Sequence, residues 1–204
     1  MDLALMTNSF EVRPLTRAEE LDAYRRLLFE VYIEEAGWNF NPDNPSGIRI
    51  SDRKLLDDRD DIATCFGVFR QDVLVGGGRI CGRFQGRFEV HGYQPERDLG
   101  FLDVPNLFEA GRAALRPEIR GSDAFPLLVL HIFEYCKSNR LFVFTTPSVR
   151  SVMRFYHSIG MPAVEGCRFR FEPEDPAEAQ LFLVDSEDVL DTVIQKLRQL
   201  LRGV

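Results

Sequence analysis

Apolar residues recur at helical spacing early in the chain, after a short alternating stretch at residues 10–15 that predicts a strand. A helix is expected to begin at Thr16, where Glu19 completes a capping box, and to end near Gly37. Its apolar stripe consists of Leu21, Tyr24, Leu28, Val31 and Tyr32. From residue 38 to 59 the periodicity stops and Asn, Asp, Pro, Ser and Gly dominate. This composition predicts a long loop, a kind of segment that often carries function.

The middle of the chain predicts a pair of strands and a second irregular region. Residues 62–69 and 73–80 are largely apolar runs joined by a three-residue turn, and we expect them to pair as a hairpin. The glycine run 76–78 lies inside the second strand. It predicts a bulge or a close approach of another part of the chain, because glycine weakens a strand but leaves room. Residues 83–105 are rich in Gly, Pro and charge and are expected to be irregular.

Strands and helices alternate in the second half of the chain. The expected elements are a strand at 106–115, a basic turn at 116–121, a helix, a buried strand at 141–144, a helix over 154–161, a hairpin of 169–171 with 181–184, and an amphipathic helix at about 187–202. This order favours an α/β fold in which a mixed sheet carries helices on both faces. We expect one domain over residues 1–204, because neither a repeat nor a linker interrupts the pattern.

Composition excludes several classes of protein. The chain has 204 residues, of which 45% are apolar, and a formal net charge of −7. A globular core is therefore expected, and nucleic acid is not an expected partner because binding phosphates requires a basic surface. The four cysteines and three histidines have no metal-ligand or disulfide spacing, which predicts free thiols in a reducing compartment and no metal site. Neither a signal peptide nor an apolar run of about 20 residues is present, so a cytoplasmic protein without a membrane span is expected.

The basic turn between residues 116 and 123 has the composition of a phosphate-binding site. A tight turn before a helix offers backbone N–H groups and the positive end of the helix dipole to a phosphate. Arg116, Arg120 and Gly121 are the residues expected to bind there. The alternative interpretation is an ordinary charged turn.

A second motif, Phe155-Tyr156-x-x-x-Gly160-Met161, lies on the last helix before the closing hairpin. A phenol presented by a helix beside a thioester sulfur can protonate the departing thiolate. The alternative is an aromatic pair in the core followed by a glycine at the helix C-terminus.

On the same helix Arg150 and Arg154 are spaced i and i+4. They form a positive face that suits an acidic acyl carrier protein or a pantetheine phosphate, or else a solvated surface.

The order of elements and these two motifs resemble the GNAT acyltransferases, whose sheet is mostly antiparallel. The turn is similar to the GNAT sequence R/Q-x-x-G-x-G/A that holds the pyrophosphate of coenzyme A, although Asp123 stands where a second small residue is usual. That difference suggests a donor whose phosphate group differs from that of coenzyme A. The aromatic motif is similar to the GNAT signature F-Y-x-x-x-G-F.

Scattered residues further resemble the autoinducer-synthase branch of this superfamily, the acyl-homoserine-lactone synthases and long-chain N-acyl amino acid synthases. The resemblance rests on Glu109-x-x-Arg112, Arg79, Trp38, Asp58 and the stretch 145–154. Two positions depart from the family pattern. The family arginine of the first helix falls on Leu28, unless Arg25 replaces it one turn earlier, and the first of two family carboxylates falls on Leu55, with Asp57 and Asp58 as replacements.

The resemblance implies roles that simple chemistry supports. An amine must lose a proton before it attacks a thioester, and Glu109 is expected to accept that proton directly or through water. The alternative is an ion pair with Arg112, although residues i and i+3 of a strand face opposite sides unless a bulge, which Gly111 would permit, intervenes. Arg79 and Arg112 are expected to bind a carboxylate of the acceptor or to brace Glu109. Trp38 either lines the site or belongs to the core.

The preferred expectation is therefore an N-acyltransferase. It would move a fatty acyl group from acyl carrier protein or acyl-CoA to the amine of a small amino-acid-like acceptor. S-adenosylmethionine would yield an acyl-homoserine lactone, and a free amino acid would yield an N-acyl amino acid. The donor and acceptor are co-substrates, and no permanently bound cofactor is expected. The alternatives are a short-chain N-acetyltransferase that uses acetyl-CoA, and a non-catalytic module that binds an acyl ligand.

Overall fold

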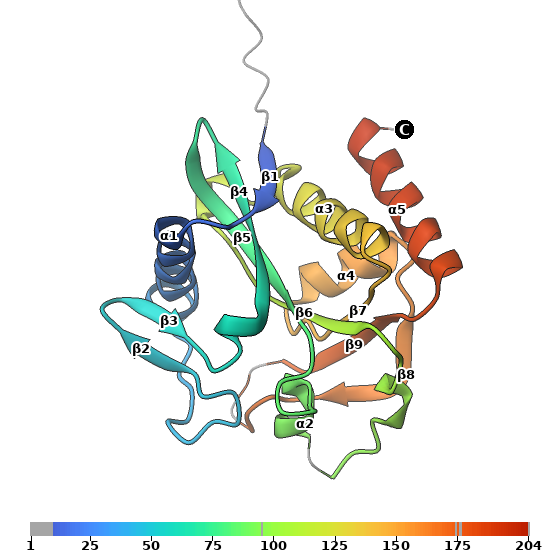
Figure 1. The fold of residues 1–204 in the computed structure, drawn as a ribbon, viewed down its shortest axis with the longest axis horizontal. Helices are drawn as coiled ribbons and strands as arrows, with labels where there is room; N and C mark the ends of the chain where they lie inside the picture. Colours follow the sequence, from blue (N-terminus) through green and yellow to red (C-terminus); the bar gives the residue numbers. More distant parts are fainter. Residues whose placement is uncertain (1–9, 95, 174, 176, 204) are drawn as a thin grey trace, which may run out of the picture.

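A twisted sheet of seven strands forms the centre of the computed structural model, which describes residues 10–94, 96–173, 175 and 177–203 (Figure 1). The strand order is β1-β4-β5-β6-β7-β9-β8. Only the β6–β7 pairing is parallel, and the other pairings in this sheet are antiparallel. The predicted α/β class, with a mostly antiparallel sheet, is confirmed.

The sheet strands are β1 (Glu11–Pro14), β4 (Ala63–Arg70), β5 (Val73–Cys81), β6 (Leu107–Leu115), β7 (Phe142–Thr145), β8 (Ala163–Phe169) and β9 (Ala179–Val184). The α-helices are α1 (Ala18–Leu28), α2 (Glu89–Tyr93), α3 (Ala124–Ser138), α4 (Arg150–Ser158) and α5 (Glu187–Arg202). A separate hairpin consists of β2 (Arg49–Ser51) and β3 (Lys54–Leu56). Short 3-10 turns are η2 (Asp60–Ile62), η3 (Gly100–Leu102) and η4 (Pro117–Ile119), and η1 (Phe29–Glu35) is a π-helix that continues α1.

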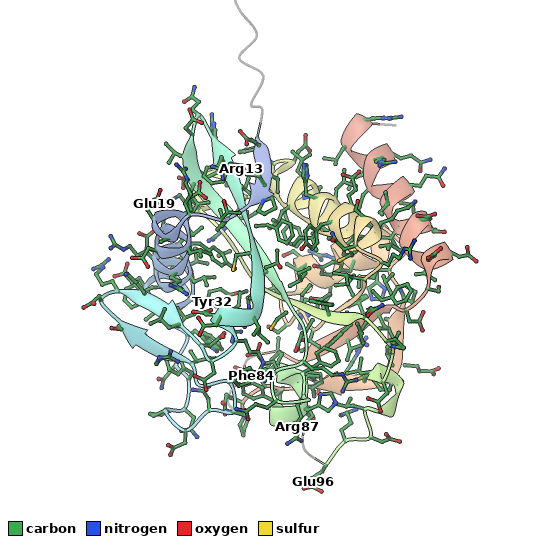
Figure 2. All side chains as sticks on the ribbon, viewed as in Figure 1. Arg13, Glu19, Tyr32, Phe84, Arg87 and Glu96 are labelled. Carbon is green, nitrogen blue, oxygen red and sulfur yellow. The ribbon has the colours of Figure 1, made fainter. Side chains whose placement is uncertain are left out.

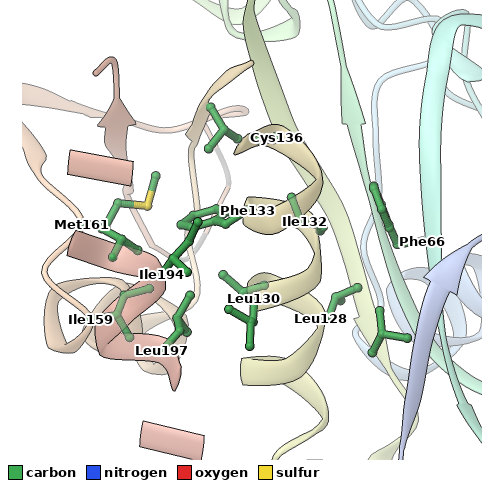
Figure 3. Close-up of a cluster of buried hydrophobic side chains, with 14 of the residues drawn as sticks. Phe66, Leu128, Leu130, Ile132, Phe133, Cys136, Ile159, Met161, Ile194 and Leu197 are labelled. Atoms are coloured by element: carbon green, nitrogen blue, oxygen red, sulfur yellow. The ribbon is translucent and has the colours of Figure 1, made fainter. Parts of the chain in front are cut away.

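Helices cover both faces of the sheet, as the sequence predicts. On one face α3 and α5 pack against apolar residues of the strands, and Figure 3 shows α3 side chains between Ile194 and Leu197 of α5 and Phe66 of β4. On the other face α1 packs over β4 and the end of β6, while Phe88 and Val90 near α2 cover β7 and β9. Two apolar clusters therefore share this second face, and the polar residues described below lie between them.

The predicted positions of the elements need four corrections. The first helix begins at Ala18, and Glu20 rather than Glu19 accepts the capping bond from the Arg17 backbone N–H. The loop predicted at 38–59 contains the β2–β3 hairpin, whose turn at Asp52 and Arg53 has positive φ angles without a glycine to signal it. The irregular region at 83–105 contains α2 and η3. The strand predicted at 169–171 ends at Phe169 and begins six residues earlier.

The glycine run in β5 has the role that its position predicts. A Cβ atom on Gly77 would lie 2.8 Å from the ring of Tyr24, so the α1 helix approaches the sheet closely here. The pairing of β5 with both neighbours also shifts register near this run. Both halves of the prediction, a bulge and a close approach, are confirmed.

Candidate active site

The central strands β6 and β7 separate at one point along their length. They pair from Leu107 and Phe142 as far as Ala110 and Thr145, where β7 ends, while β6 continues for five more residues. Beyond that point Gly111 is exposed although β6 is a central strand, and a Cβ atom added to it would meet nothing within 4 Å. We call this place, bounded by residues 110–113 and Thr145, the β6–β7 opening.

A β-bulge lies at the edge of the β6–β7 opening. Gly77 pairs with Ala114 but Arg79 pairs with Gly111, so β6 contains one extra residue, and Arg112 has a φ of 52°. The bulge that the sequence allowed is therefore present, although Arg112 rather than Gly111 takes the left-handed conformation. As a result Arg112 and Glu109 lie on the same face of the sheet.

Two tyrosines hold the backbone of the bulge in place. The Tyr24 hydroxyl donates to the carbonyl oxygen of Arg112 at 2.6 Å, and the Tyr32 hydroxyl donates to that of Ala113 at 3.0 Å. Tyr32 belongs to the π-helix η1, and π-helical turns are frequent at functional sites. Trp38, half-buried, packs against the Tyr32 ring with a centroid distance of 5.4 Å. The structure thus places Trp38 beside the residues that support the bulge.

Next to the bulge lies a buried group of ionised side chains, Asp57, Asp60, Arg79, Glu89 and Arg112, which we call the charge cluster. Arg79 donates to Asp57 at 2.8 Å and to Asp60 at 3.2 Å, and its second terminal nitrogen lies 2.7 Å from Asp57. Arg112 donates to Asp57 at 3.2 Å and to Glu89 at 2.5 Å. Each arginine is therefore bound by two carboxylates of the protein itself.

These contacts change how the carboxylates titrate. Burial raises the pKa of Asp57, but the guanidinium groups of Arg112 and Arg79 outweigh it and bring the pKa down to about 2. Glu89 is also buried, and the same two arginines hold its pKa below the ordinary value. Both side chains are therefore ionised at neutral pH and neutralise the two arginines.

Glu109 is buried, with 8% of its surface exposed, and binds the first turn of α2. Its two carboxylate oxygens accept the backbone N–H groups of Glu89 at 2.6 Å and Val90 at 3.3 Å. Burial and the neighbouring Glu89 carboxylate raise the pKa of Glu109 to about 8, against the opposing effect of these N–H donors. Glu109 lies one residue below the β6–β7 opening, and each of its oxygens keeps a lone pair beside the N–H bond it accepts, so the ionised carboxylate can still take a proton.

Tyr156 lies on the opposite face of the sheet at the same level. Its ring packs among Phe125, Phe155 and Phe182, and its hydroxyl lies close enough to the side chain of Thr145, at the end of β7, for Thr145 to lower its pKa slightly. Burial raises the pKa of Tyr156 to about 12, so the phenol remains protonated at neutral pH and can act as a proton donor. Because Ala110 pairs with Thr145, Glu109 and Tyr156 flank the β6–β7 opening from its two sides.

The arginines of the predicted phosphate turn are bound to glutamates of η1. Arg120 forms a two-bond pair with Glu35, and Arg116 lies 3.3 Å from Glu30. Each of these side chains is about 40% exposed. Gly121 follows with a φ of 78° and open space around its Cα. A ligand can therefore approach the backbone of this turn closely at Gly121. The two arginines pair with exposed glutamates, which a bound phosphate can replace.

The remaining predicted residues fall in two places. Arg150 and Arg154 are exposed on α4, and no ion pair joins either of them to another residue within the described ranges. Asp58 lies outside the charge cluster, because its carboxylate points to the surface and pairs with Arg49 at 2.9 Å. Asp57 and Asp60, three residues apart like Leu55 and Asp58, bind Arg79 instead. Two carboxylates with the expected spacing therefore meet Arg79, but they stand two positions later in the chain than Leu55 and Asp58.

The two positions considered for the arginine of the first helix have different surroundings. Leu28 is buried in the apolar cluster under α1. Arg25, one turn earlier, lies 3.2 Å from Asp60 through its Nε atom and extends the charge cluster.

Sequence reasoning missed Asp60, Glu89 and Arg59 altogether. The burial of an acidic residue in a polar segment leaves no periodic pattern in the sequence. A prediction of the short helix at 89–93 would have been the one available indication of Glu89.

Comparisons with known proteins were made on both sequence and structure. No protein-family model matches the sequence, and no curated protein is significantly similar to it. Solved structures do match. FeeM, an N-acyl amino acid synthase from uncultured soil microbes, aligns with a TM-score of 0.64 and 20% identity over 91% of this chain and 94% of its own.

Two further structures extend the comparison. BjaI, a CoA-dependent acyl-homoserine lactone synthase solved with SAM and isopentyl-CoA, aligns with a TM-score of 0.70 and 16% identity, over 93% of this chain and 90% of its own. A structure described as a GNAT-family acetyltransferase from Desulfovibrio desulfuricans aligns at 0.53 and 11% identity, over 87% and 99%. The chain has the GNAT fold. The resemblance to the autoinducer-synthase-like branch is confirmed at the level of this fold, which the chain shares with acyltransferases.

Three further features concern metal ligands, membrane-spanning helices and cysteines. In the ranges that the structure describes, no group of three or more His, Cys, Asp or Glu side chains is arranged to hold a metal ion. None of the described helices combines the length and the apolar character needed to cross a membrane. The four cysteines are all buried and unpaired.

Proposed function

We propose that this protein is an N-acyltransferase that moves a fatty acyl group from a thioester to the amine of an amino-acid-like acceptor. The observation that carries the proposal is the β6–β7 opening, with a protonated phenol on one side and a buried carboxylate on the other. The fold that the chain shares with FeeM and BjaI supports the same reaction class.

The chemistry requires that the acceptor nitrogen lose two protons and that the departing thiolate gain one. With a pKa of about 8, Glu109 is ionised in a fraction of the molecules near neutral pH. In that form it accepts a proton from the ammonium group of the acceptor, and the free amine then attacks the thioester carbonyl carbon. A C–N bond forms and the C–S bond breaks as the tetrahedral intermediate collapses. Tyr156 gives its proton to the thiolate, which leaves as a thiol, and the second proton lost by the attacking nitrogen passes to the phenolate and restores the phenol. The position of the phenol beside Thr145, at the point where the strands separate, supports this assignment.

The charge cluster supports the acceptor side of the site. Because Arg79 and Arg112 are each bound by internal carboxylates, their proposed role is to brace the strand that carries Glu109 rather than to bind the acceptor. Trp38 and Tyr32 form an aromatic wall next to the bulge and are the proposed contacts for the body of the acceptor. Asp58 is not assigned a role here, since its side chain binds Arg49 at the surface.

The donor side depends on the turn at residues 116–121. Arg116, Arg120 and Gly121 are proposed to bind the phosphates of the donor after Glu30 and Glu35 are exchanged. Arg150 and Arg154 offer a positive helix face to the phosphopantetheine or to the acidic surface of a carrier protein. Both coenzyme A and acyl carrier protein fit this description.

A product screen tests the proposal. The purified protein is incubated with acyl-CoA or acyl carrier protein thioesters of several chain lengths, acetyl-CoA included, together with S-adenosylmethionine or mixed amino acids. Mass spectrometry should find an N-acylated product that depends on both substrates. Acetyl transfer alone would indicate the short-chain enzyme instead, and thiol release without any N-acylated product would refute acyl transfer. Boiled protein and a Glu109→Gln variant are the controls.

A further inference from the structure

One buried cation near Glu109 has no anionic partner. Arg59 is 5% exposed, and its Nε atom is buried without a hydrogen-bond partner. No ion pair or side-chain hydrogen bond joins its guanidinium group to another residue in the part of the chain that the structure describes. Its ring contact is with Phe84, whose centroid lies 5.6 Å from the guanidinium carbon. An arginine is almost never this deeply buried unless it is paired, because removing its charge from water is costly.

The position of Arg59 is set by the same loop that supplies the charge cluster. Its backbone N–H donates to Asp57 at 2.9 Å, and its carbonyl oxygen accepts the N–H of Ile62 at 3.1 Å. The side chain then extends toward the end of β5, where its positive charge acts on Cys81 and on Glu109, two residues that pair across β5 and β6. The unpaired guanidinium group is thus within electrostatic range of the carboxylate that is proposed as the base.

The other arginines of this region cannot take the same ligand. Arg79 and Arg112 already direct their nitrogens at Asp57, Asp60 and Glu89. A further anion at either arginine would have to displace one of these carboxylates and leave it buried and unpaired, which is strongly unfavourable. Arg59 has no such competitor.

We propose that Arg59 binds the carboxylate of the acceptor and so selects α-amino acids, or molecules that retain the α-amino acid group, over simple amines. This inference rests on the proposed acyl transfer. A planar guanidinium group accommodates a carboxylate through two parallel hydrogen bonds. The α-amine is attached to the carbon next to that carboxylate, so anchoring the carboxylate at Arg59 brings the amine toward Glu109. Figure 2 labels Phe84 and Arg87 in the turn between β5 and α2, and the Phe84 ring of this turn contacts the guanidinium group of Arg59.

The test uses Arg59→Met, which keeps an unbranched apolar stem and removes the guanidinium group with its charge. The matched control is Arg26→Met, at an exposed arginine of α1. Acceptors are offered in pairs, S-adenosylmethionine with its decarboxylated form and each common amino acid with the matching decarboxylated amine. The wild-type protein and Arg26→Met should prefer the carboxylate member. In Arg59→Met the KM of that member should rise about 10- to 100-fold, while the amine is used as before.

Thermal unfolding supplies a second readout that does not depend on turnover. Without ligand, Arg59→Met should have an equal or higher Tm than the wild type, because an apolar side chain replaces a buried unpaired charge. A lower Tm would mean that Arg59 is a structural ion-pair partner, and the inference would be wrong. It would also be wrong if Arg59→Met kept the preference for the carboxylate acceptor.

The two proposals can fail separately. If the wild-type protein transfers no acyl group, the proposed function fails, and the acceptor site is then tested by binding alone. In that case an amino acid or S-adenosylmethionine should raise the Tm of the wild type and of Arg26→Met but not that of Arg59→Met. The absence of any carboxylate-dependent shift in the wild type would overturn the assignment of Arg59.

Discussion

The charge cluster and the turn at residues 116–121 both contain two arginines, but these arginines differ in their surroundings. Arg79 is buried and Arg112 largely so, and each is bound by two carboxylates. Arg116 and Arg120 are about 40% exposed, and each pairs with one glutamate of η1, while Arg120 also donates to the carbonyl oxygen of Leu115. Breaking a buried pair leaves an isolated charge in a medium of low polarity, whereas water replaces an exposed pair at little cost. The first region is therefore suited to fixing the geometry of the site, and the second to exchanging its partners for a ligand.

Removing one arginine from each region tests this difference in pairing most directly. Arg79→Met should lower the free energy of unfolding by about 3–5 kcal/mol, because Asp57 and Asp60 then lose a shared cation. Arg120→Met should change it little, since its partner Glu35 is solvated. Urea unfolding monitored by circular dichroism measures both values. Equal losses would show that the two regions do not differ in this way.

The second largest effect is expected on kcat. Glu109→Gln and Tyr156→Phe should each lower kcat by about 10²- to 10⁴-fold, the usual contribution of a positioned acid or base. Binding of the donor should not change, because neither side chain lies in the turn that is proposed to bind phosphates. Tyr135→Phe, at a half-buried tyrosine of α3, is the matched control. Steady-state kinetics with product detection decides the outcome, and activity that survives in Glu109→Gln would remove Glu109 from the reaction.

The raised pKa of Glu109 predicts how stability depends on pH. Its pKa is about 8 in the folded protein and 4.5 in the unfolded chain, so the folded state holds this proton more tightly. The resulting stabilisation is fully present below pH 4.5 and is lost as the pH rises through 8. Glu109→Gln should therefore flatten the fall in Tm between pH 5 and 8. An unchanged slope in the variant would mean that other groups cause the fall. The stabilisation from the ion pairs of Asp57 is fully present above pH 3.8 and is lost as the pH falls through about 2.

The smallest effect is expected at the donor turn. Glu35→Gln removes the charge that holds Arg120, so coenzyme A without an acyl group should bind a few-fold more tightly. Glu34→Gln is the control, because Glu34 lies on the same π-helix but pairs with Arg53. Fluorescence of Trp38, the single tryptophan of the chain, can follow binding because it packs against Tyr32 of η1. Equal affinities in both variants would show that Glu35 does not compete with the ligand.

Much of the fold could be predicted because it depends on local patterns. The stripe of α1, the strand at 107–115 and the amphipathic α5 are periodic, and each is found within a few residues of its expected position. The short β2–β3 hairpin and α2 were not predicted, because each is held by contacts with distant parts of the chain rather than by its own pattern. Glu89, for example, contacts Ser46 and Arg112, which are 43 and 23 residues away.

The sequence alone was sufficient to determine the order of elements, the GNAT-like sheet and the motif that contains Tyr156, because these follow from periodicity and from residues close together in the chain. Only the tertiary structure decided which acids meet which arginines: Asp57 and Asp60 rather than Asp58, and Glu89 in addition. The same holds for Arg59, whose missing partner is visible only once every neighbouring carboxylate has been placed. The physical reason is that charges pair through space, at a register set by the sheet and by the bulge at Arg112, and no local pattern encodes that register.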